Sequence, residues 1–216
     1  MRKSIFLLPL VLWAGTATAE PVTIAALGDS LTQGYGLPAE DGFVPQLQAW
    51  LDAQGVEAKV LNAGVSGDTT AGGASRVAWT LTPDVDAMIV TLGGNDLLRG
   101  IPPEVSRANL QAILEVASDA DVDVLLVGMQ APGNFGPDYK AQFDAIYPDL
   151  SAQFGTAYAP SFFAGLLSQG DTAPAALQPS FQADGIHPHA QGVIQIVQGL
   201  GPHVLDRIRA ADAGQD

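Results

Sequence analysis

The 216-residue chain contains no cysteine. It therefore forms no disulfide bonds. If the protein is exported, to a compartment where disulfides commonly stabilise proteins, packing must supply its stability instead. The lack of a thiol also excludes a thiol-linked lipid anchor, so we expect a soluble mature protein with no stable membrane anchor. With three histidines and no His-Glu-x-x-His pattern, the sequence gives no reason to expect a zinc site.

Positive charge is scarce. Nine lysines and arginines face 23 aspartates and glutamates, which gives a formal net charge of −14. Such a surface repels nucleic acid and anionic lipid headgroups, so neither is expected as a partner. The acidic residues are scattered along the chain, and this pattern favours a role in solubility over an acidic tail.

The N-terminal apolar run, residues 5–13, is too short to span a membrane. Arg2 and Lys3 precede it and the small residues 17–19 follow it, which is the pattern of a secretory signal peptide. The alternative is a buried first strand or helix. Cleavage after residue 19 would leave a single domain, residues 20–216, which is predicted to be periplasmic or secreted.

Apolar runs alternate with stretches of helical periodicity, without internal repeats or linkers. Strands are predicted over residues 22–27, 58–61, 85–92, 122–129 and 156–158. Helices are predicted over residues 42–54, 70–81, 102–120, 139–154 and 189–209, with interruptions at Pro148 and at Gly201-Pro202. Residues 161–180 are predicted to be irregular, with one helical turn near 162–167. The alternation predicts a parallel sheet covered by helices on both faces.

Polar clusters follow three of the predicted strands. They are Gly28-Asp29-Ser30, Ser66-Gly67-Asp68 and Gly93-Gly94-Asn95-Asp96. Since the carboxyl ends of parallel strands lie along one edge of the sheet, these clusters are expected to converge where ligands usually bind.

Ser30 is a candidate nucleophile, but a serine hydroxyl needs a base and an orienting acid. Asp184 and His187 are spaced so that a tight turn brings the carboxylate against the imidazole. This spacing alone would also fit a metal pair or a surface turn. The oxyanion formed by attack on an acyl carbon needs preorganised donors, which the N–H groups of Ser30 and Gly67 and the amide of Asn95 are able to supply.

Taken in order, the clusters at residues 28–31, 66–69, 93–96 and 184–188 resemble the four sequence blocks of the SGNH, or GDSL, hydrolases. The resemblance is greatest to the periplasmic bacterial acyl-thioesterase, lysophospholipase and arylesterase branch. It implies a flavodoxin-like three-layer α/β/α sandwich with a five-stranded parallel sheet, no metal and no cofactor. The absence of Gly-x-Ser-x-Gly disfavours the α/β-hydrolase fold.

The same resemblance implies that Ser30 is the nucleophile, His187 the base and Asp184 its orienting acid. Gly67 and Asn95 would complete the oxyanion hole with Ser30. The expected substrates are small acyl esters, acyl thioesters and lysophospholipids, cleaved by a monomer through an acyl-enzyme. A loop over the acyl groove corresponds to residues 130–136, and Gln130-Ala131 stand where relatives tend to carry a basic and a larger apolar residue.

Each of these residues also has a structural interpretation. Ser30 could cap a helix. Asp29, Asn62 and Asp96 are interpreted as residues that fix turns, and Asp68 and Thr69 as helix caps. His189 competes with His187 for the role of base but is expected to be exposed, as is His203. The aromatic residues Phe135, Tyr139, Phe162 and Phe163 are assigned to the core in preference to an acyl pocket.

Two other functions remain open. The first is a carbohydrate O-deacetylase on the same scaffold. The second is a non-catalytic periplasmic binding module, in which residues 28–34 cradle a phosphate. That loop contains no lysine or arginine, and the chain is strongly acidic, so the second function is disfavoured.

Overall fold

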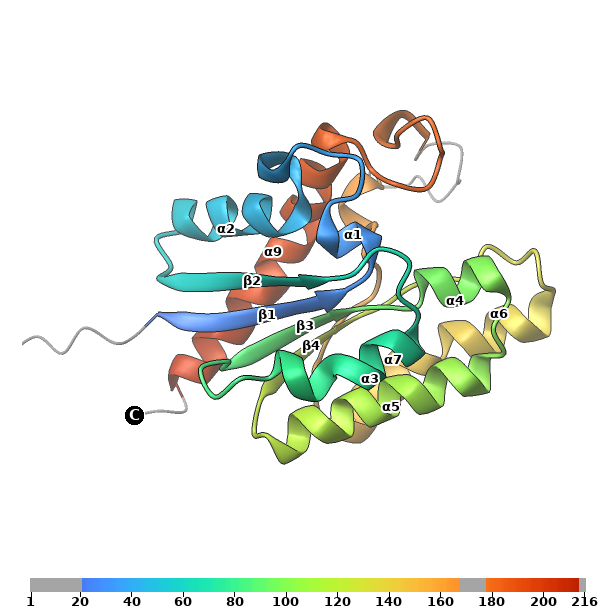
Figure 1. Cartoon of the computed structure of the whole chain (residues 1–216), viewed down its shortest axis with the longest axis horizontal. Coiled ribbons are helices and arrows are strands. Elements are labelled where there is room, and N and C mark those ends of the chain that lie inside the picture. Colours follow the sequence, from blue (N-terminus) through green and yellow to red (C-terminus); the bar gives the residue numbers. More distant parts are fainter. Residues whose placement is uncertain (1–20, 168–177, 214–216) are drawn as a thin grey trace, which may run out of the picture.

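A five-stranded sheet forms the centre of the molecule (Figure 1). The computed structural model describes residues 21–167 and 178–213. The strands are β1 (Val22–Gly28), β2 (Ala58–Gly64), β3 (Ala87–Thr91), β4 (Asp123–Val127) and β5 (Ala157–Ala159). They lie in the order β2-β1-β3-β4-β5, and every pair is parallel. The predicted strands are confirmed, with ends that shift by a few residues.

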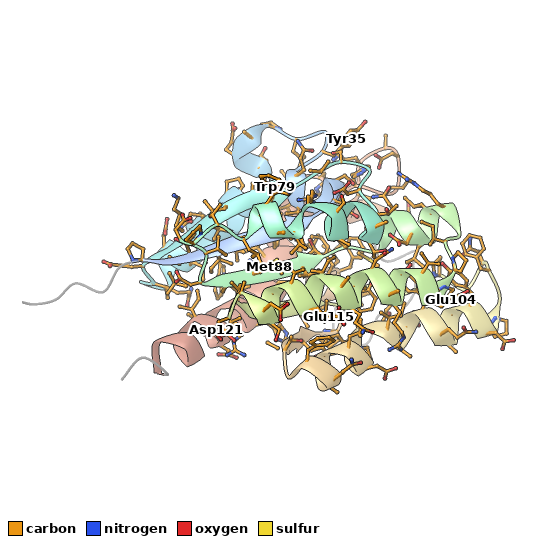
Figure 2. The ribbon with its side chains drawn as sticks, turned by 60° about the horizontal axis from the view of Figure 1, so that its bottom comes forward. Tyr35, Trp79, Met88, Glu104, Glu115 and Asp121 are labelled. Atoms are coloured by element: carbon orange, nitrogen blue, oxygen red, sulfur yellow. The ribbon has the colours of Figure 1, made fainter. Side chains whose placement is uncertain are left out.

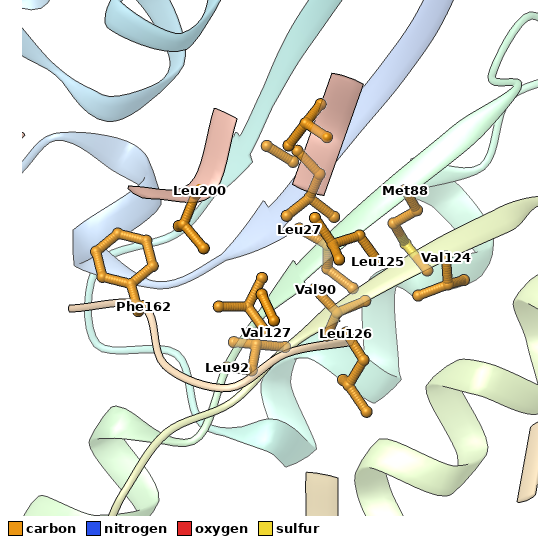
Figure 3. Close-up of a cluster of buried hydrophobic side chains, with 14 of the residues drawn as sticks. Leu27, Met88, Val90, Leu92, Val124, Leu125, Leu126, Val127, Phe162 and Leu200 are labelled. Atoms are coloured by element: carbon orange, nitrogen blue, oxygen red, sulfur yellow. The ribbon is translucent and has the colours of Figure 1, made fainter. Parts of the chain in front are cut away.

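The central strands are covered on both faces. All seven residues of β1 and all five of β3 are buried, as expected for an inner strand of a parallel sheet. Figure 3 shows part of this core, with Leu27 of β1, Val90 of β3 and Leu125 of β4 on neighbouring strands. The sheet is thus held mainly by the burial of branched apolar side chains.

The two faces carry different helices. One face is covered by α2 (Phe43–Ala53) and α9 (Ala190–Ala213), and the other by α3 (Thr70–Thr80), α5 (Pro103–Asp119) and α7 (Ile146–Phe154). Figure 2 shows α3 and α5, marked by Trp79 and Glu115, alongside each other on the second face. The result is the predicted three-layer sandwich. Within the described residues, no helix is both long and apolar enough to cross a bilayer.

The helix predicted over residues 139–154 is two helices, α6 (Pro137–Asp144) and α7. Pro148 causes the break, because a proline ring clashes with the carbonyl four residues before it, here that of Asp144. The interruption therefore comes before the proline, which lies in the first turn of α7 and is tolerated there.

The predicted break of the last helix at Gly201-Pro202 is wrong. Helix α9 continues through Pro202, which is exposed, while Leu200 and Val204 on either side of it are buried. Gly201 lies against the indole ring of Trp50, where a Cβ would come within 2.7 Å of the ring. Packing of the apolar face thus outweighs the hydrogen bond that the proline removes.

Two short helices, α1 (Ser30–Gln33) and α4 (Gly94–Arg99), begin directly after β1 and β3, where the sequence predicts only turns. The helical turn predicted near 162–167 is a 3₁₀ turn at Ala164–Leu166. The predicted signal peptide, residues 1–19, and residues 168–177 of the predicted irregular stretch lie outside the described residues.

Candidate active site

Ser30 is the first residue of α1, at the carboxyl end of β1. The cap of this helix is Asp29, whose Oδ1 accepts the N–H of Leu31 at 3.0 Å. The alternative in which Ser30 caps the helix is therefore wrong, and the turn-fixing interpretation of Asp29 is confirmed. With the cap supplied by its neighbour, the hydroxyl of Ser30 points to His187, with 2.9 Å between Oγ and Nε2.

His187 is held by a turn that Asp184 organises. One oxygen of Asp184, Oδ1, accepts the N–H groups of Ile186 at 2.9 Å and His187 at 3.0 Å. The other, Oδ2, lies 2.7 Å from Nδ1 of His187. The bond from the imidazole, followed by the two backbone bonds, lowers the pKa of Asp184 to about 2. An ionised Asp184 favours the tautomer with its proton on Nδ1, which leaves Nε2 free to accept the proton of Ser30.

The predicted meeting of the two ends of the chain is thereby confirmed: Ser30 and His187 are 157 positions apart and in contact. Both segments lie at the carboxyl edge of the sheet, where α1 and the segment before α9 are on the same side of the molecule (Figure 1). Parallel topology is the reason, since it gathers the ends of the strands along this edge.

Asn95 and Gly67, the other predicted donors, are fixed by separate contacts. Asn95 lies in the first turn of α4, and its Nδ2 donates to Oδ2 of Asp29 at 3.3 Å. Gly67 has a φ of +83°, which favours glycine, and its carbonyl accepts from Arg99 at 2.7 Å. Asn95 lines the same cleft as Ser30, whereas Gly67 is not among the described residues that line it.

The cleft beside Ser30 has a volume of about 370 Å³. The surface of its walls is mostly apolar. The apolar side chains that line it are Leu31, Leu97, Leu98, Met129, Pro132, Phe163 and Ile186, and the polar ones besides Ser30 are Asp29, Asn95, Gln130 and Asn134. Of the four aromatic residues assigned to the core, Phe162 is buried as predicted, and Tyr139 and Phe163 pack against the core. Phe163 also lines the cleft, and the assignment is wrong for Phe135, which is exposed. The cleft offers an apolar surface next to a hydrogen-bonded hydroxyl.

The loop over the cleft is anchored from behind. Gln130 lines the cleft, but Ala131 is buried in the core, and its N–H donates to Asp144 at 2.8 Å. Lys140 donates to the carbonyl of Ala131 at 2.7 Å and pairs with Asp144 at 2.6 Å. Of the two positions expected to differ from relatives, Gln130 is thus the one that lines the cleft.

The prediction that His189 is exposed is wrong. The residue is partly buried, its Nδ1 accepts the N–H of Gly192 at 3.2 Å, and its Nε2 donates to the carbonyl of Pro179 at 2.6 Å. Because Gly192 lies in the first turn of α9, His189 caps this helix. His203 is exposed on α9, as predicted.

The remaining polar residues of the blocks act structurally. Asn62 accepts the N–H of Gly64 and Thr69 that of Gly72, so the predicted turn and cap are confirmed. Asp68 pairs with Arg76 at 2.7 Å instead of capping a helix.

Buried Asp96 joins α4, α3 and α5, so its role is wider than the fixing of a local turn that the sequence predicted. It accepts the N–H and hydroxyl of Thr70 and the hydroxyl of Ser106.

Arg76 was missed by sequence reasoning. It donates to the carbonyl oxygens of Gly28 at 2.8 Å and Ala63 at 2.7 Å, so it ties the carboxyl ends of β1 and β2 together. These bonds join residues that are 48 and 13 positions apart, so no local sequence pattern predicts them.

Among the described residues, no group of three histidine, aspartate or glutamate side chains could hold a metal ion.

Asp29 is expected to make stability depend on pH. Burial raises its pKa to about 6, although the N–H of Leu31, the amide of Asn95 and nearby His187 lower it and Asp96 adds to the rise. Because the folded protein holds this proton more tightly than the unfolded chain, the stabilisation is complete below pH 4 and is lost as pH rises through 6.

Asp29→Asn removes this titration. From pH 4 to pH 7, the wild type should lose on the order of 3 kcal/mol of unfolding free energy relative to the variant. Urea unfolding of both proteins at several pH values measures the difference. A difference that stays constant across this range would contradict the assignment.

Comparison with known proteins agrees with this geometry. The family described as "GDSL-like Lipase/Acylhydrolase family" matches residues 26–193. Esterase TesA of Pseudomonas aeruginosa is 37% identical over 90% of this chain and 92% of its own. Thioesterase 1/protease 1/lysophospholipase L1 of Escherichia coli is 34% identical over 85% and 83%, respectively.

Solved structures give the same result. The crystal structure of TesA superposes with a TM-score of 0.74 at 35% identity and covers 84% of this chain and 97% of that one. The structure of AlinE4, an SGNH-hydrolase family esterase, has a TM-score of 0.69 at 39% identity, with 88% and 98% covered. Sequence blocks, topology and relatives therefore agree, and the chain belongs to the GDSL-like lipase/acylhydrolase family, the SGNH hydrolases.

Proposed function

We propose that the protein is a serine hydrolase that cleaves carboxylic esters and acyl thioesters through an acyl-enzyme on Ser30. One observation carries the proposal: an unbroken chain of hydrogen bonds runs from Asp184 through His187 to Ser30, with 2.7 Å and 2.9 Å between the bonded atoms. It ends at a hydroxyl that lines an apolar cleft. This arrangement suits acyl transfer, because it joins nucleophile, base and orienting acid.

In the proposed reaction, Oγ of Ser30 attacks the acyl carbon while Nε2 of His187 takes its proton. Asp184 stabilises the imidazolium that forms, and the oxyanion lies toward the N–H groups of Ser30 and Gly67 and the amide of Asn95. His187 then returns the proton to the departing alcohol or thiol. Water, deprotonated by His187, attacks the acyl-enzyme and releases the acid and free Ser30.

The lining of the cleft supports acyl chains as the bound group. Apolar side chains dominate its walls, and no lysine or arginine is among the described residues that line it. Lysine or arginine would strengthen phosphate binding, so this lining gives the binding-module alternative no support. The relatives named esterase, arylesterase and thioesterase/lysophospholipase support the same substrate class.

A substrate panel tests the proposal. It contains p-nitrophenyl acetate, butyrate, octanoate and palmitate, octanoyl-CoA, a lysophosphatidylcholine and acetylated xylan. We expect hydrolysis of short and medium acyl esters, with octanoate cleaved faster than acetate because its chain contacts more of the apolar wall. Release of acetate from the glycan without cleavage of octanoyl esters would favour the O-deacetylase instead.

We infer further that residues 1–19 are removed on export and that the mature protein acts as a monomer in the periplasm or outside the cell. The pattern of Arg2, Lys3 and the apolar run supports export. All five proposed site residues come from one chain, so the proposed reaction needs no residue from a second copy. N-terminal sequencing of the exported protein, expected to begin at Glu20, and its size in solution test these inferences.

A further inference from the structure

Gln182 links the segment that carries His187 to the segment that carries Ser30. Its side-chain Nε2 donates to the carbonyl oxygens of Tyr35 at 2.9 Å and Pro188 at 3.0 Å. Its backbone N–H donates to the carbonyl of His187 at 2.7 Å. One amide thus joins two parts of the chain that are 147 positions apart.

Tyr35, whose carbonyl accepts the bond from Gln182, also contacts both Ser30 and His187. Its N–H donates to the carbonyl of Ser30 at 3.1 Å, so the peptide that Gln182 holds lies one turn beyond the hydroxyl. Its ring also packs on the imidazole of His187, with 4.5 Å between ring centroids. Contacts from Gln182 therefore flank the Ser30–His187 pair on both sides.

The backbone next to Tyr35 leaves room for this amide. Gly36 has a φ of +75°, and a Cβ there would lie 2.4 Å from Oε1 of Gln182. A side chain at residue 36 would thus displace the glutamine as well as strain the backbone. The close fit shows that the position of the amide is set from both segments.

Apolar contacts hold both ends of the His187 segment, because Phe181 packs against the core and Pro188 is buried. The turn between them has less support. Asp184, Gly185 and Ile186 are all exposed, so apolar burial does little to fix the turn against α1. The Oγ–Nε2 distance of 2.9 Å therefore depends in part on the contacts that bridge the two segments at Tyr35, which are the ring contact with His187 and the hydrogen bond from Gln182. A displacement of about 1 Å at a reacting pair can reduce turnover by roughly 100-fold.

We propose that Gln182 is a positioning residue that keeps His187 within proton-transfer distance of Ser30. This role rests on the proposed function, since it matters for catalysis only if the pair reacts. Gln182 is not among the described residues that line the cleft. It acts through the carbonyl groups of Tyr35 and Pro188, and it should affect both formation and hydrolysis of the acyl-enzyme because His187 serves both steps.

Gln182→Met removes the donors and keeps the approximate size of the side chain. Gln182→Glu keeps the shape, but a carboxylate cannot donate to two carbonyl groups. In both variants we expect kcat per active site to fall roughly 10- to 100-fold, with KM within about twofold. A fluorophosphonate that labels Ser30 counts the active sites, so partly unfolded protein is excluded, and its rate of reaction should fall in parallel.

Gln48→Met is the matched control. Gln48 also makes several bonds, to the carbonyl of Ala58, to Asp52 and to the N–H of Val60, each at 2.8 Å, but at the opposite end of the sheet. This variant should lose stability and keep wild-type kcat per labelled site. The same loss of kcat in Gln48→Met, or kcat within twofold of wild type in both Gln182 variants, overturns the positioning role.

The wild type separates this proposal from the proposed function. A wild-type protein that neither cleaves acyl esters nor reacts with the fluorophosphonate overturns the hydrolase assignment, and the positioning role with it. A reactive wild type with unimpaired Gln182 variants overturns the positioning role alone.

Discussion

Replacing Ser30 by alanine is expected to abolish hydrolysis of p-nitrophenyl esters, with a loss on the order of 10⁴-fold or more in kcat. The hydroxyl is the proposed point of attachment of the acyl group, and no other hydroxyl among the described residues bonds to the His187 ring. The fold should survive, because alanine is the best helix former and residue 30 lies in the first turn of α1. Initial rates and urea unfolding measure the two effects.

Ser66→Ala is the control for this variant. Ser66 belongs to the second sequence block and donates to the side chain of Gln33 at 2.9 Å, which places it close to the end of α1. Its hydroxyl has no part in the proposed reaction, so the variant should keep wild-type turnover and react with a phosphonate as the wild type does. Turnover that persists in Ser30→Ala, or a phosphonate attached to another residue, would contradict the assignment of the nucleophile.

The overall topology and the convergence of the blocks that follow strands could be predicted from the sequence for a common physical reason. Buried parallel strands leave long apolar runs, and chain reversals at their ends leave glycines and polar residues. Since a parallel sheet brings its carboxyl ends to one edge, the blocks that follow strands are predicted to converge there. The meeting of residues 30 and 187 was predicted from the resemblance to the SGNH hydrolases, because the segment with His187 does not directly follow a predicted strand.

The supports of the site could not be predicted, because their contacts depend on three-dimensional proximity. Arg76 bonds to carbonyl groups of two strands, and Gln182 to a carbonyl 147 positions away. A backbone carbonyl is present at every residue, so neither contact requires a recognisable partner in the sequence. Pro202 was misleading for a related reason: the local signal of a helix break is outweighed by burial of the residues on either side of it.

His187→Ala should nearly eliminate both turnover and covalent labelling of Ser30 by an organophosphonate. Nε2 of His187 accepts the proton of the Ser30 hydroxyl at 2.9 Å. Without it, Ser30 remains a neutral alcohol, which is a weak nucleophile. We expect kcat to fall on the order of 10⁴-fold, while the rate of labelling, followed by mass spectrometry, falls to the level of Ser30→Ala.

His189→Ala provides the comparison within the same segment. Both nitrogens of His189 are engaged by the backbone, one with Gly192 and the other with Pro179, so it is held away from proton transfer. Loss of this helix cap should cost about 1 kcal/mol of unfolding free energy and leave kcat and labelling close to wild type. An inactive His189→Ala together with normal labelling of His187→Ala would contradict the assignment of His187 as the base. The contact between Ser30 and His187 would then have no part in catalysis.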